Sequence, residues 1–90
     1  MAKASVDPAE LRRFAQGLVR FNHDLEGLFA GLHGRLRALE NSWNDQEQRK
    51  FVESFEQTFK ILSVFLESSE EHARFLAKKA EFVEKYLNHQ

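Results

Sequence analysis

The chain has 90 residues, no cysteine and a formal net charge of −1. This length suits one small domain, and the absence of cysteine excludes disulfides and thiolate metal sites. Acidic and basic residues are interspersed, which argues against the clustered basic face of a nucleic-acid-binding protein. The unusual count is nine phenylalanines, which need an apolar environment somewhere.

A first helix is predicted over about residues 8–40. Asp7 suits its N-cap, Pro8 its first helical position, and Glu10 follows the cap by three residues, as in a capping box. Leucine then recurs every seven residues, at Leu11, Leu18, Leu25, Leu32 and Leu39. The second core position of the heptads is assigned to Phe14, Phe21 and Leu28. A repeat of this length predicts a helix packed along a left-handed seam.

A second helix is predicted over about residues 46–87, after a polar turn at residues 41–45. Asn44 suits its N-cap, with Glu47 three residues later and Asp45 at the positive end of the helix. Its predicted seam consists of Val52, Phe55, Phe59, Leu62, Leu66, Ser69, Ala73, Leu76, Ala80, Val83 and Leu87. We therefore expect an all-α fold, a single antiparallel helical hairpin over residues 1–90.

The two helices have more apolar side chains than one internal seam can cover. The surplus phenylalanines are Phe29, Phe51, Phe65, Phe75 and Phe82. The first helix also has a line of glycines at Gly27, Gly31 and Gly34, each of which costs about 1 kcal/mol relative to alanine. We interpret both sets as one dimer interface, through which hairpins form a four-helix bundle with a second copy or a similar protein. The alternative is that the glycines only tolerate bends and the phenylalanines only thicken the seam.

No group of residues predicts catalysis, a cofactor or a metal site. The four histidines, at His23, His33, His72 and His89, have no partner at a recognised metal-ligand spacing. The glycines follow helical rather than loop spacing, so they predict no phosphate-binding loop. We expect a protein that is not an enzyme, binds no cofactor, metal or nucleic acid, and does not insert stably into a membrane.

The single tryptophan, Trp43, lies in the polar turn between the predicted helices. Tryptophan is rarely placed in a solvated turn, so two interpretations are open. The indole is either a wedge that closes the end of the hairpin or an anchor that docks a partner together with Asn44 and Asp45. We favour the wedge, because Leu39 and the second seam give the ring apolar neighbours.

The chain resembles the WXG family (ESAT-like) of small type VII (ESX) secretion substrates. The resemblance rests on the turn Leu39-Glu40-Asn41-Ser42-Trp43-Asn44-Asp45, followed by a phenylalanine-rich helix. It covers nearly the whole chain at the level of architecture, although Asp45 stands where the family motif has glycine. The resemblance implies hairpins that dimerise into four-helix bundles. It also implies export in the folded state through a membrane ATPase, alone or as escorts for larger, toxin-like effectors.

The start of the chain lacks the apolar run of a cleaved signal peptide, so export would use a route without one. The family's C-terminal export signal is a tyrosine followed four residues later by an acid. Tyr86 has a matching place, but Gln90 stands where the acid would be. The leading prediction is a secretion substrate or escort that is cytoplasmic before export. The alternative is a cytoplasmic structural or adaptor module, and an amphipathic membrane-surface binder is a third, weaker class.

Overall fold

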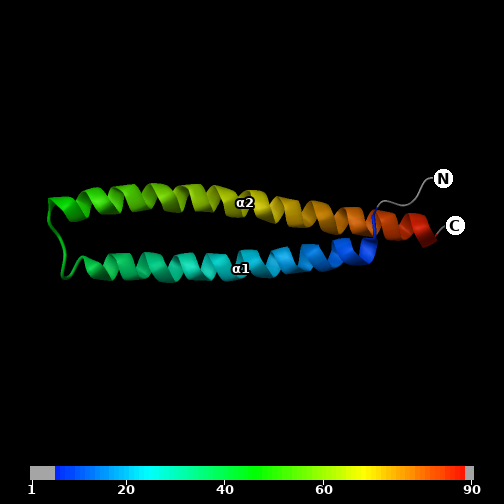
Figure 1. The fold of residues 1–90 in the computed structure, drawn as a ribbon, viewed down its shortest axis with the longest axis horizontal. Helices are drawn as coiled ribbons and strands as arrows, with labels where there is room; N and C mark the ends of the chain where they lie inside the picture. Colours follow the sequence, from blue (N-terminus) through cyan, green and yellow to red (C-terminus); the bar gives the residue numbers. More distant parts are fainter. Residues whose placement is uncertain (1–5, 89–90) are drawn as a thin grey trace.

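The computed structural model describes residues 6–88, which form two helices, α1 (Pro8–Leu39) and α2 (Gln46–Asn88). The helices run antiparallel in a rod of 68 × 19 × 15 Å, as predicted for an all-α hairpin (Figure 1). Compared with the sequence prediction, α1 ends one residue earlier and α2 ends one residue later. Since α2 has 43 residues and α1 has 32, α2 extends past the start of α1 at the open end (Figure 1).

Each helix begins with an aspartate cap. Oδ1 of Asp7 accepts a hydrogen bond from the backbone N–H of Ala9 at 2.9 Å, as the sequence predicts for α1. In α2 the cap is Asp45 and not Asn44, because Oδ1 of Asp45 accepts from the backbone N–H of Gln48 at 2.9 Å. The helix therefore begins one residue later than an Asn44 cap would set it. The residue that replaces the family's glycine thus has a structural role of its own.

The inner face of α2 is formed by the predicted seam. Leu66, Ser69, Ala73 and Ala80 are buried, and most of the remaining seam positions are half-buried. The exception is Leu87, which is 44% exposed near the end of the helix. The predicted inner face of α2 is therefore correct along most of its length.

The inner face of α1 differs from the prediction in both columns: the leucines are half-buried at Leu11, Leu18 and Leu25 but exposed at Leu32 and Leu39, and the second column is exposed throughout. Phe14, Phe21 and Leu28 are 62%, 50% and 70% exposed, so they do not fill the interior of the hairpin. The leucines of the seven-residue repeat form what we call the leucine column. The column that packs against α2 lies four residues after these leucines, and not three as predicted. It consists of Ala15, Asn22, Phe29 and Leu36. Positions i+3 and i+4 lie on opposite sides of position i in a helix. The leucine column therefore borders two apolar columns, of which α2 covers only one.

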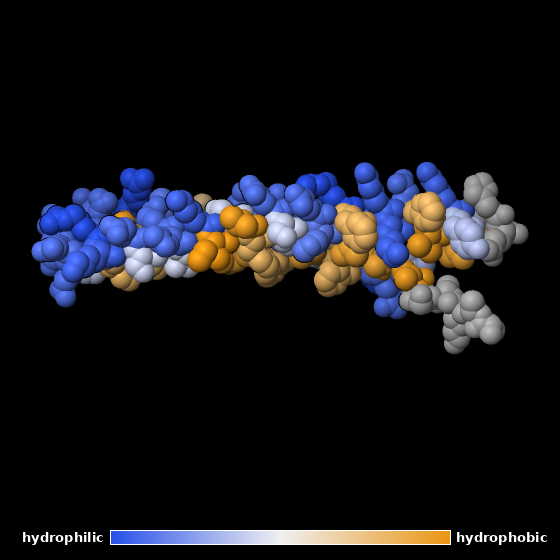
Figure 2. Space-filling model, turned by 90° about the horizontal axis from the view of Figure 1, so that it is seen from above, coloured by the Kyte–Doolittle hydropathy of each residue, from blue (hydrophilic) through white to orange (hydrophobic). Residues whose placement is uncertain are grey.

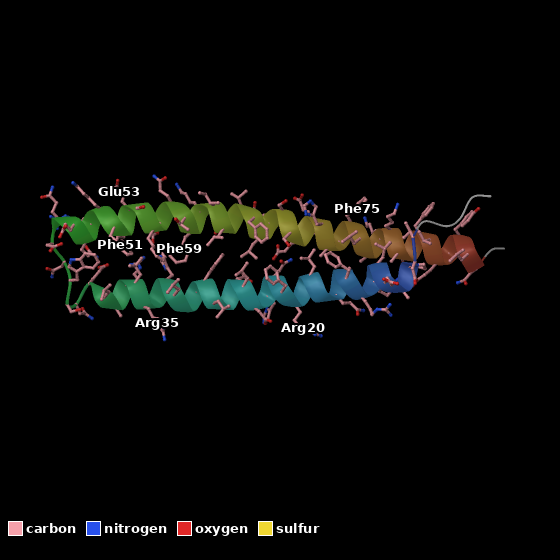
Figure 3. The ribbon with its side chains drawn as sticks, viewed as in Figure 1. Arg20, Arg35, Phe51, Glu53, Phe59 and Phe75 are labelled. Carbon is pink, nitrogen blue, oxygen red and sulfur yellow. The ribbon has the colours of Figure 1, made fainter. Side chains whose placement is uncertain are left out.

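Side-chain size changes along the seam. Ala15, Ala73 and Ala80 are at most 4% exposed and allow close approach near the open end. Toward the turn the seam contains phenylalanines, with the Phe29 and Phe59 rings edge to face at 6.0 Å between centroids. Figure 3 shows Phe59 between the helices, and in Figure 1 the helices lie farther apart near the turn than near the open end. The spacing of the helices thus follows the size of the residues between them.

Candidate interaction surface

Exposed apolar side chains from both helices gather on one face of the hairpin. We call it the apolar face, and its members are Phe14, Phe21, Leu28 and Leu32 on α1 and Ile61, Phe65, Phe75, Phe82 and Tyr86 on α2. Each of these side chains is between 45% and 73% exposed. Figure 2 shows hydrophobic residues gathered from the middle to the right of the rod, largely toward its lower edge, with hydrophilic residues over the left end and along much of the upper edge. A surface of this kind is typical of a protein interface.

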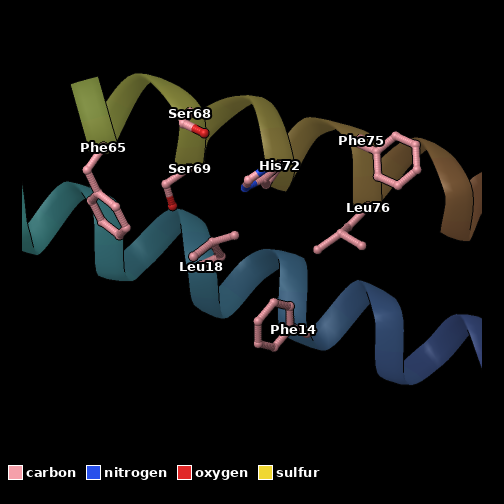
Figure 4. A pocket seen from close by; sticks show the side chains of 8 residues that line it. All are labelled: Phe14, Leu18, Phe65, Ser68, Ser69, His72, Phe75 and Leu76. Atoms are coloured by element: carbon pink, nitrogen blue, oxygen red, sulfur yellow. The ribbon is translucent and has the colours of Figure 1, made fainter. Parts of the chain in front are cut away.

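A groove crosses the seam near the middle of the apolar face. Its volume is about 560 Å³, and Figure 4 shows its lining: Phe14 and Leu18 from α1, and Phe65, Ser68, Ser69, His72, Phe75 and Leu76 from α2. Because both helices line the same groove, the exposed apolar side chains of α1 and those of α2 lie on the same side of the hairpin.

A second groove lies on α1 nearer the turn. Its volume is about 450 Å³, and it is lined by Gly27, Leu28, Gly31, Leu32 and Arg35. A Cβ atom added at Gly27 or Gly31 would meet no heavy atom within 4 Å. Packing within the hairpin therefore does not require glycine at these positions, although glycine weakens a helix.

The opposite side of the seam is polar. Arg12 donates two hydrogen bonds to the Glu84 carboxylate, at 2.7 and 3.2 Å, and His33 Nε2 lies 2.6 Å from Glu56 Oε1. Arg12 and His33 each follow a leucine-column position by one residue, which places them on the far side of that column from Phe14. The hydrogen bonds from Arg12 hold the pKa of the Glu84 carboxyl below its usual value, and the same contact raises the pKa of Arg12. We call this surface the polar face.

The tryptophan turn closes the wide end of the hairpin. The backbone N–H of Trp43 donates to the carbonyl oxygen of Leu39 at 2.9 Å. Its indole is half-buried, with its centroid 5.7 Å from that of the Phe51 ring, while Asn44 and Asp45 are exposed. This position fits a wedge, and the docking of a partner by the exposed part stays a prediction.

The predicted interface residues do not share one environment. Phe65, Phe75 and Phe82 belong to the apolar face, and Gly27 and Gly31 line the second groove. Gly34 is exposed on α1.

The other two phenylalanines contact residues of the hairpin itself. Phe29 packs against Phe59 inside the seam, and Phe51 lies between Trp43 and Phe55 near the turn. The exposed Phe14, Phe21 and Leu28, which the sequence pattern assigned to the seam, extend the apolar face onto α1. One signal in the sequence could have predicted that these three residues are exposed. Phe29 and Leu36 form a second apolar column beside the leucines, and only one of the two columns can face α2.

The remaining predictions concern the ends of α2 and the absence of chemistry. Tyr86 is 61% exposed in the last turns of α2, and Gln90 lies outside the described residues. Within residues 6–88, His, Asp and Glu side chains form no group of three or more that could hold a metal ion. No helix in that same range is both long and apolar enough to cross a membrane.

Comparison with solved structures reveals close relatives of the fold. The hairpin matches the wild-type secreted protein EsxB from Bacillus anthracis str. Sterne with a TM-score of 0.79 and 25% identity, over 90% of this chain and 87% of that one. A mutant of the same protein matches with a TM-score of 0.78 at the same identity and coverage. Its selenomethionine form matches with a TM-score of 0.81 and 23% identity, over 96% and 98% of the two chains. No protein-family model and no curated protein matches the sequence.

The likeness extends over nearly the full length of both chains, and the secreted EsxB proteins share the two-helix hairpin that the tryptophan turn closes here. The chain therefore has the helical-hairpin fold of these secreted EsxB proteins, which agrees with its resemblance to the WXG family, and Asp45 stands where the family motif has glycine.

Proposed function

We propose that this chain is a non-enzymatic type VII secretion substrate, or an escort for a larger effector, that acts as a homodimer joined through its apolar face. The observation that carries the proposal is the unequal pair of faces on one hairpin. The apolar face exposes large side chains from both helices, whereas the polar face has the Arg12–Glu84 ion pair and the His33–Glu56 hydrogen bond between the helices. Such a hairpin resembles half of a four-helix bundle.

The area of the apolar face supports a stable dimer. Its five phenylalanines are between 46% and 73% exposed. At roughly 200 Å² for each side chain, they present about 600 Å² per protomer. The exposed leucines, isoleucine and tyrosine bring this surface to the order of 800 Å² per partner that a standard interface buries.

The distribution of side-chain size favours two copies that run in opposite directions. Phe14, Phe75 and Phe82 lie in the half of the rod that contains the open end, whereas the groove at Gly27 and Gly31 lies in the half that contains the turn. If the turn of one copy lies beside the open end of the other, the bulky half of each faces the small-residue half of its partner. Shape complementarity of this kind gives an isologous, closed dimer.

Sedimentation velocity with two matched variants tests the dimer. Phe75 and Val19 are 63% and 58% exposed, but Val19 lies on the other side of the seam, in a groove that Glu26, Glu70 and Arg74 also line. We expect Phe75→Ala to raise the dimer dissociation constant at least tenfold, whereas Val19→Ala leaves it within twofold of wild type. A wild-type chain that remains a monomer at micromolar concentration would refute the homodimer, and equal effects of the two variants would refute this face.

Export needs a separate experiment, because Gln90 in place of an acid favours the cytoplasmic adaptor as a second candidate. The tagged protein is expressed in a bacterium with an active type VII system and in the same strain without its membrane ATPase. Appearance in the culture supernatant only when the ATPase is present supports a substrate or escort, and loss of that signal in Tyr86→Ala supports a degenerate export motif. Retention in the cytosol of both strains supports the adaptor and contradicts export.

A further inference from the structure

We infer that the polar face carries a docking site for a partner protein, and that this site receives a lysine side chain of the partner. The site is a groove on the side of the seam opposite the apolar face. It is therefore open in the separate hairpin and in the proposed dimer alike, and the inference goes beyond the proposed function without depending on it.

The groove lies between the two helices, midway along the polar face. Its volume is about 290 Å³. Two heptads separate Glu26 from Arg12 and Glu70 from Glu84, which places both Glu26 and Glu70 on the polar face. The residues of its lining that matter here are Val19, Asn22 and Glu26 from α1 and Glu70, Ala73 and Arg74 from α2.

An unpaired amide atom lies at the floor of this groove. Asn22 is 4% exposed, and within residues 6–88 its only side-chain partner is the Ser69 hydroxyl at 2.7 Å. Ser69 lines the groove of the apolar face, whereas Asn22 lines the groove of the polar face, so the amide atom that Ser69 does not bind lies toward the polar face. Because a hydroxyl can accept as well as donate, Ser69 can pair with the amide nitrogen and leave the oxygen free to accept from a ligand. A donor that enters the groove thus removes the cost of a buried, unpaired amide atom.

The charges around the groove favour a cation. Neither Glu26 nor Glu70 forms an ion pair within residues 6–88, and the counter-charge at the rim is Arg74. The chain as a whole has a net charge of only −1, but the surface of α2 beside the groove is more negative. A negative surface attracts a positively charged partner and repels a second copy of itself. The two columns of α2 that contain Glu70 and Arg74 have the acids Glu53, Glu56, Glu67, Glu70, Glu81 and Glu84 and the bases Lys60 and Arg74.

Lysine fits this set of groups better than arginine does. Its ammonium has three N–H donors and no acceptor, which matches the two carboxylates and the Asn22 amide oxygen. Its aliphatic stem can lie against Val19 and Ala73, because Val19 is 58% exposed at the wall of the groove. The planar guanidinium of arginine is instead suited to a bidentate pair with one carboxylate. One lysine therefore satisfies the amide and compensates the acidic rim at the same time.

Titration of the ¹⁵N-labelled protein by NMR tests both the affinity and the place of binding. The probe is an alanine-rich helical peptide with one lysine in every turn, at neutral pH and constant ionic strength. We expect the largest shift changes at Val19, at Arg74 and at the side-chain amide of Asn22. The same peptide with acetylated lysines lacks the charge, so it is expected not to bind. Absence of binding by the lysine peptide at millimolar protein, or shift changes centred on the apolar face, overturns the inference.

Paired variants separate the groove from the general charge of the polar face. Glu26→Gln with Glu70→Gln is expected to weaken peptide binding about tenfold, a few-fold for each carboxylate. The matched control, Glu53→Gln with Glu81→Gln, removes the same charge from the polar face and is expected to change affinity less than twofold. Its two sites lie outside the groove, with Glu53 near the turn (Figure 3) and Glu81 near the open end. Equal effects of the two pairs would mean that only the overall field attracts the peptide, which overturns the site.

A second double variant tests the amide without changing any charge. Asn22→Leu with Ser69→Ala is expected to weaken peptide binding at least threefold, while circular dichroism shows an intact hairpin. Full affinity in this variant overturns the site, and so does spermidine that binds more tightly than the peptide with the same dependence on Glu26 and Glu70, since the ligand would then be a small polyamine. These outcomes are independent of the dimer: a wild-type monomer that still binds the peptide in the groove refutes the proposed homodimer and supports the inference.

Discussion

A buried polar pair joins the two helices at the middle of the hairpin. The Ser69 hydroxyl donates to Oδ1 of Asn22 at 2.7 Å, and both residues are only 4% exposed. Nδ2 of Asn22 is buried and has no hydrogen-bond partner within residues 6–88. Turning the amide over would pair the nitrogen with Ser69 and orphan the oxygen instead, so one amide atom is unpaired in either orientation. A buried polar atom in this state costs about 1–3 kcal/mol.

Replacing both members of the pair with apolar residues tests this reasoning. Asn22→Leu with Ser69→Ala removes the unpaired atom and buries more apolar surface, so we expect the free energy of unfolding to rise by about 1–3 kcal/mol. Ser69→Ala alone leaves both amide atoms of Asn22 unpaired, so it is expected to lower that free energy by about 1–3 kcal/mol. The single and double variants together form a cycle that isolates the interaction between the two residues.

Urea unfolding followed by circular dichroism provides the measurement. All variants are compared at one protein concentration, because dimerisation adds to apparent stability. With a slope of roughly 1–2 kcal/mol/M for a domain of this size, the midpoint of the double variant is expected to rise by about 1 M. A double variant that unfolds at lower urea concentration than wild type would refute the reasoning, since it would mean that the Asn22 amide is fully satisfied in the native protein.

Three further predictions concern the turn and the polar face. Because the indole is half-buried, Trp43→Ala is expected to lower the free energy of unfolding by about 1–3 kcal/mol. Unchanged stability with loss of a partner in a pull-down would instead favour the docking anchor. Asp45→Ala removes the acceptor for the Gln48 N–H and should cost about 1 kcal/mol by thermal unfolding, and no change would contradict its capping role. Since Arg12 lowers the pKa of Glu84, their pair stabilises the hairpin above about pH 4.3 and loses that effect as the pH falls further. The difference in unfolding midpoint between wild type and Glu84→Gln should therefore disappear in acid, and a difference independent of pH would contradict it.

The secondary structure follows from local signals that act within a few residues. A strong N-cap at Asp7, the seven-residue repeat and a polar turn are sufficient to predict two helices and one hairpin. The cap of α2 was less determined, because Asn44 and Asp45 are adjacent and both are good capping residues. Which of them accepts the hydrogen bond depends on how the turn around Trp43 closes, and that closure depends on tertiary contacts.

The inner face of α1 was beyond the reach of periodicity. The leucine column has phenylalanine at Phe14 and Phe21 on one side, and Phe29 and Leu36 on the other. The leucine column gives the same seven-residue repeat with either of its two neighbouring columns. The pattern alone therefore does not say which of these neighbours packs against α2. The same ambiguity explains why Phe29, predicted at the dimer interface, contacts Phe59 within the hairpin. On α2 the surplus phenylalanines border the seam mainly on one side, and Phe65, Phe75 and Phe82 could be predicted as exposed.

The two faces of the hairpin also limit how far association can proceed. Once the apolar faces of two copies meet, the surfaces that point outward include the polar faces, each with the Arg12–Glu84 and His33–Glu56 pairs. Charged side chains that already pair within the hairpin gain little by meeting another copy, and burying them would carry a desolvation cost. An isologous contact that uses the same face of both copies leaves no second apolar face for a third. We therefore expect the proposed assembly to stop at two chains, and a concentration-dependent series of larger species in sedimentation velocity would show that the polar face also associates.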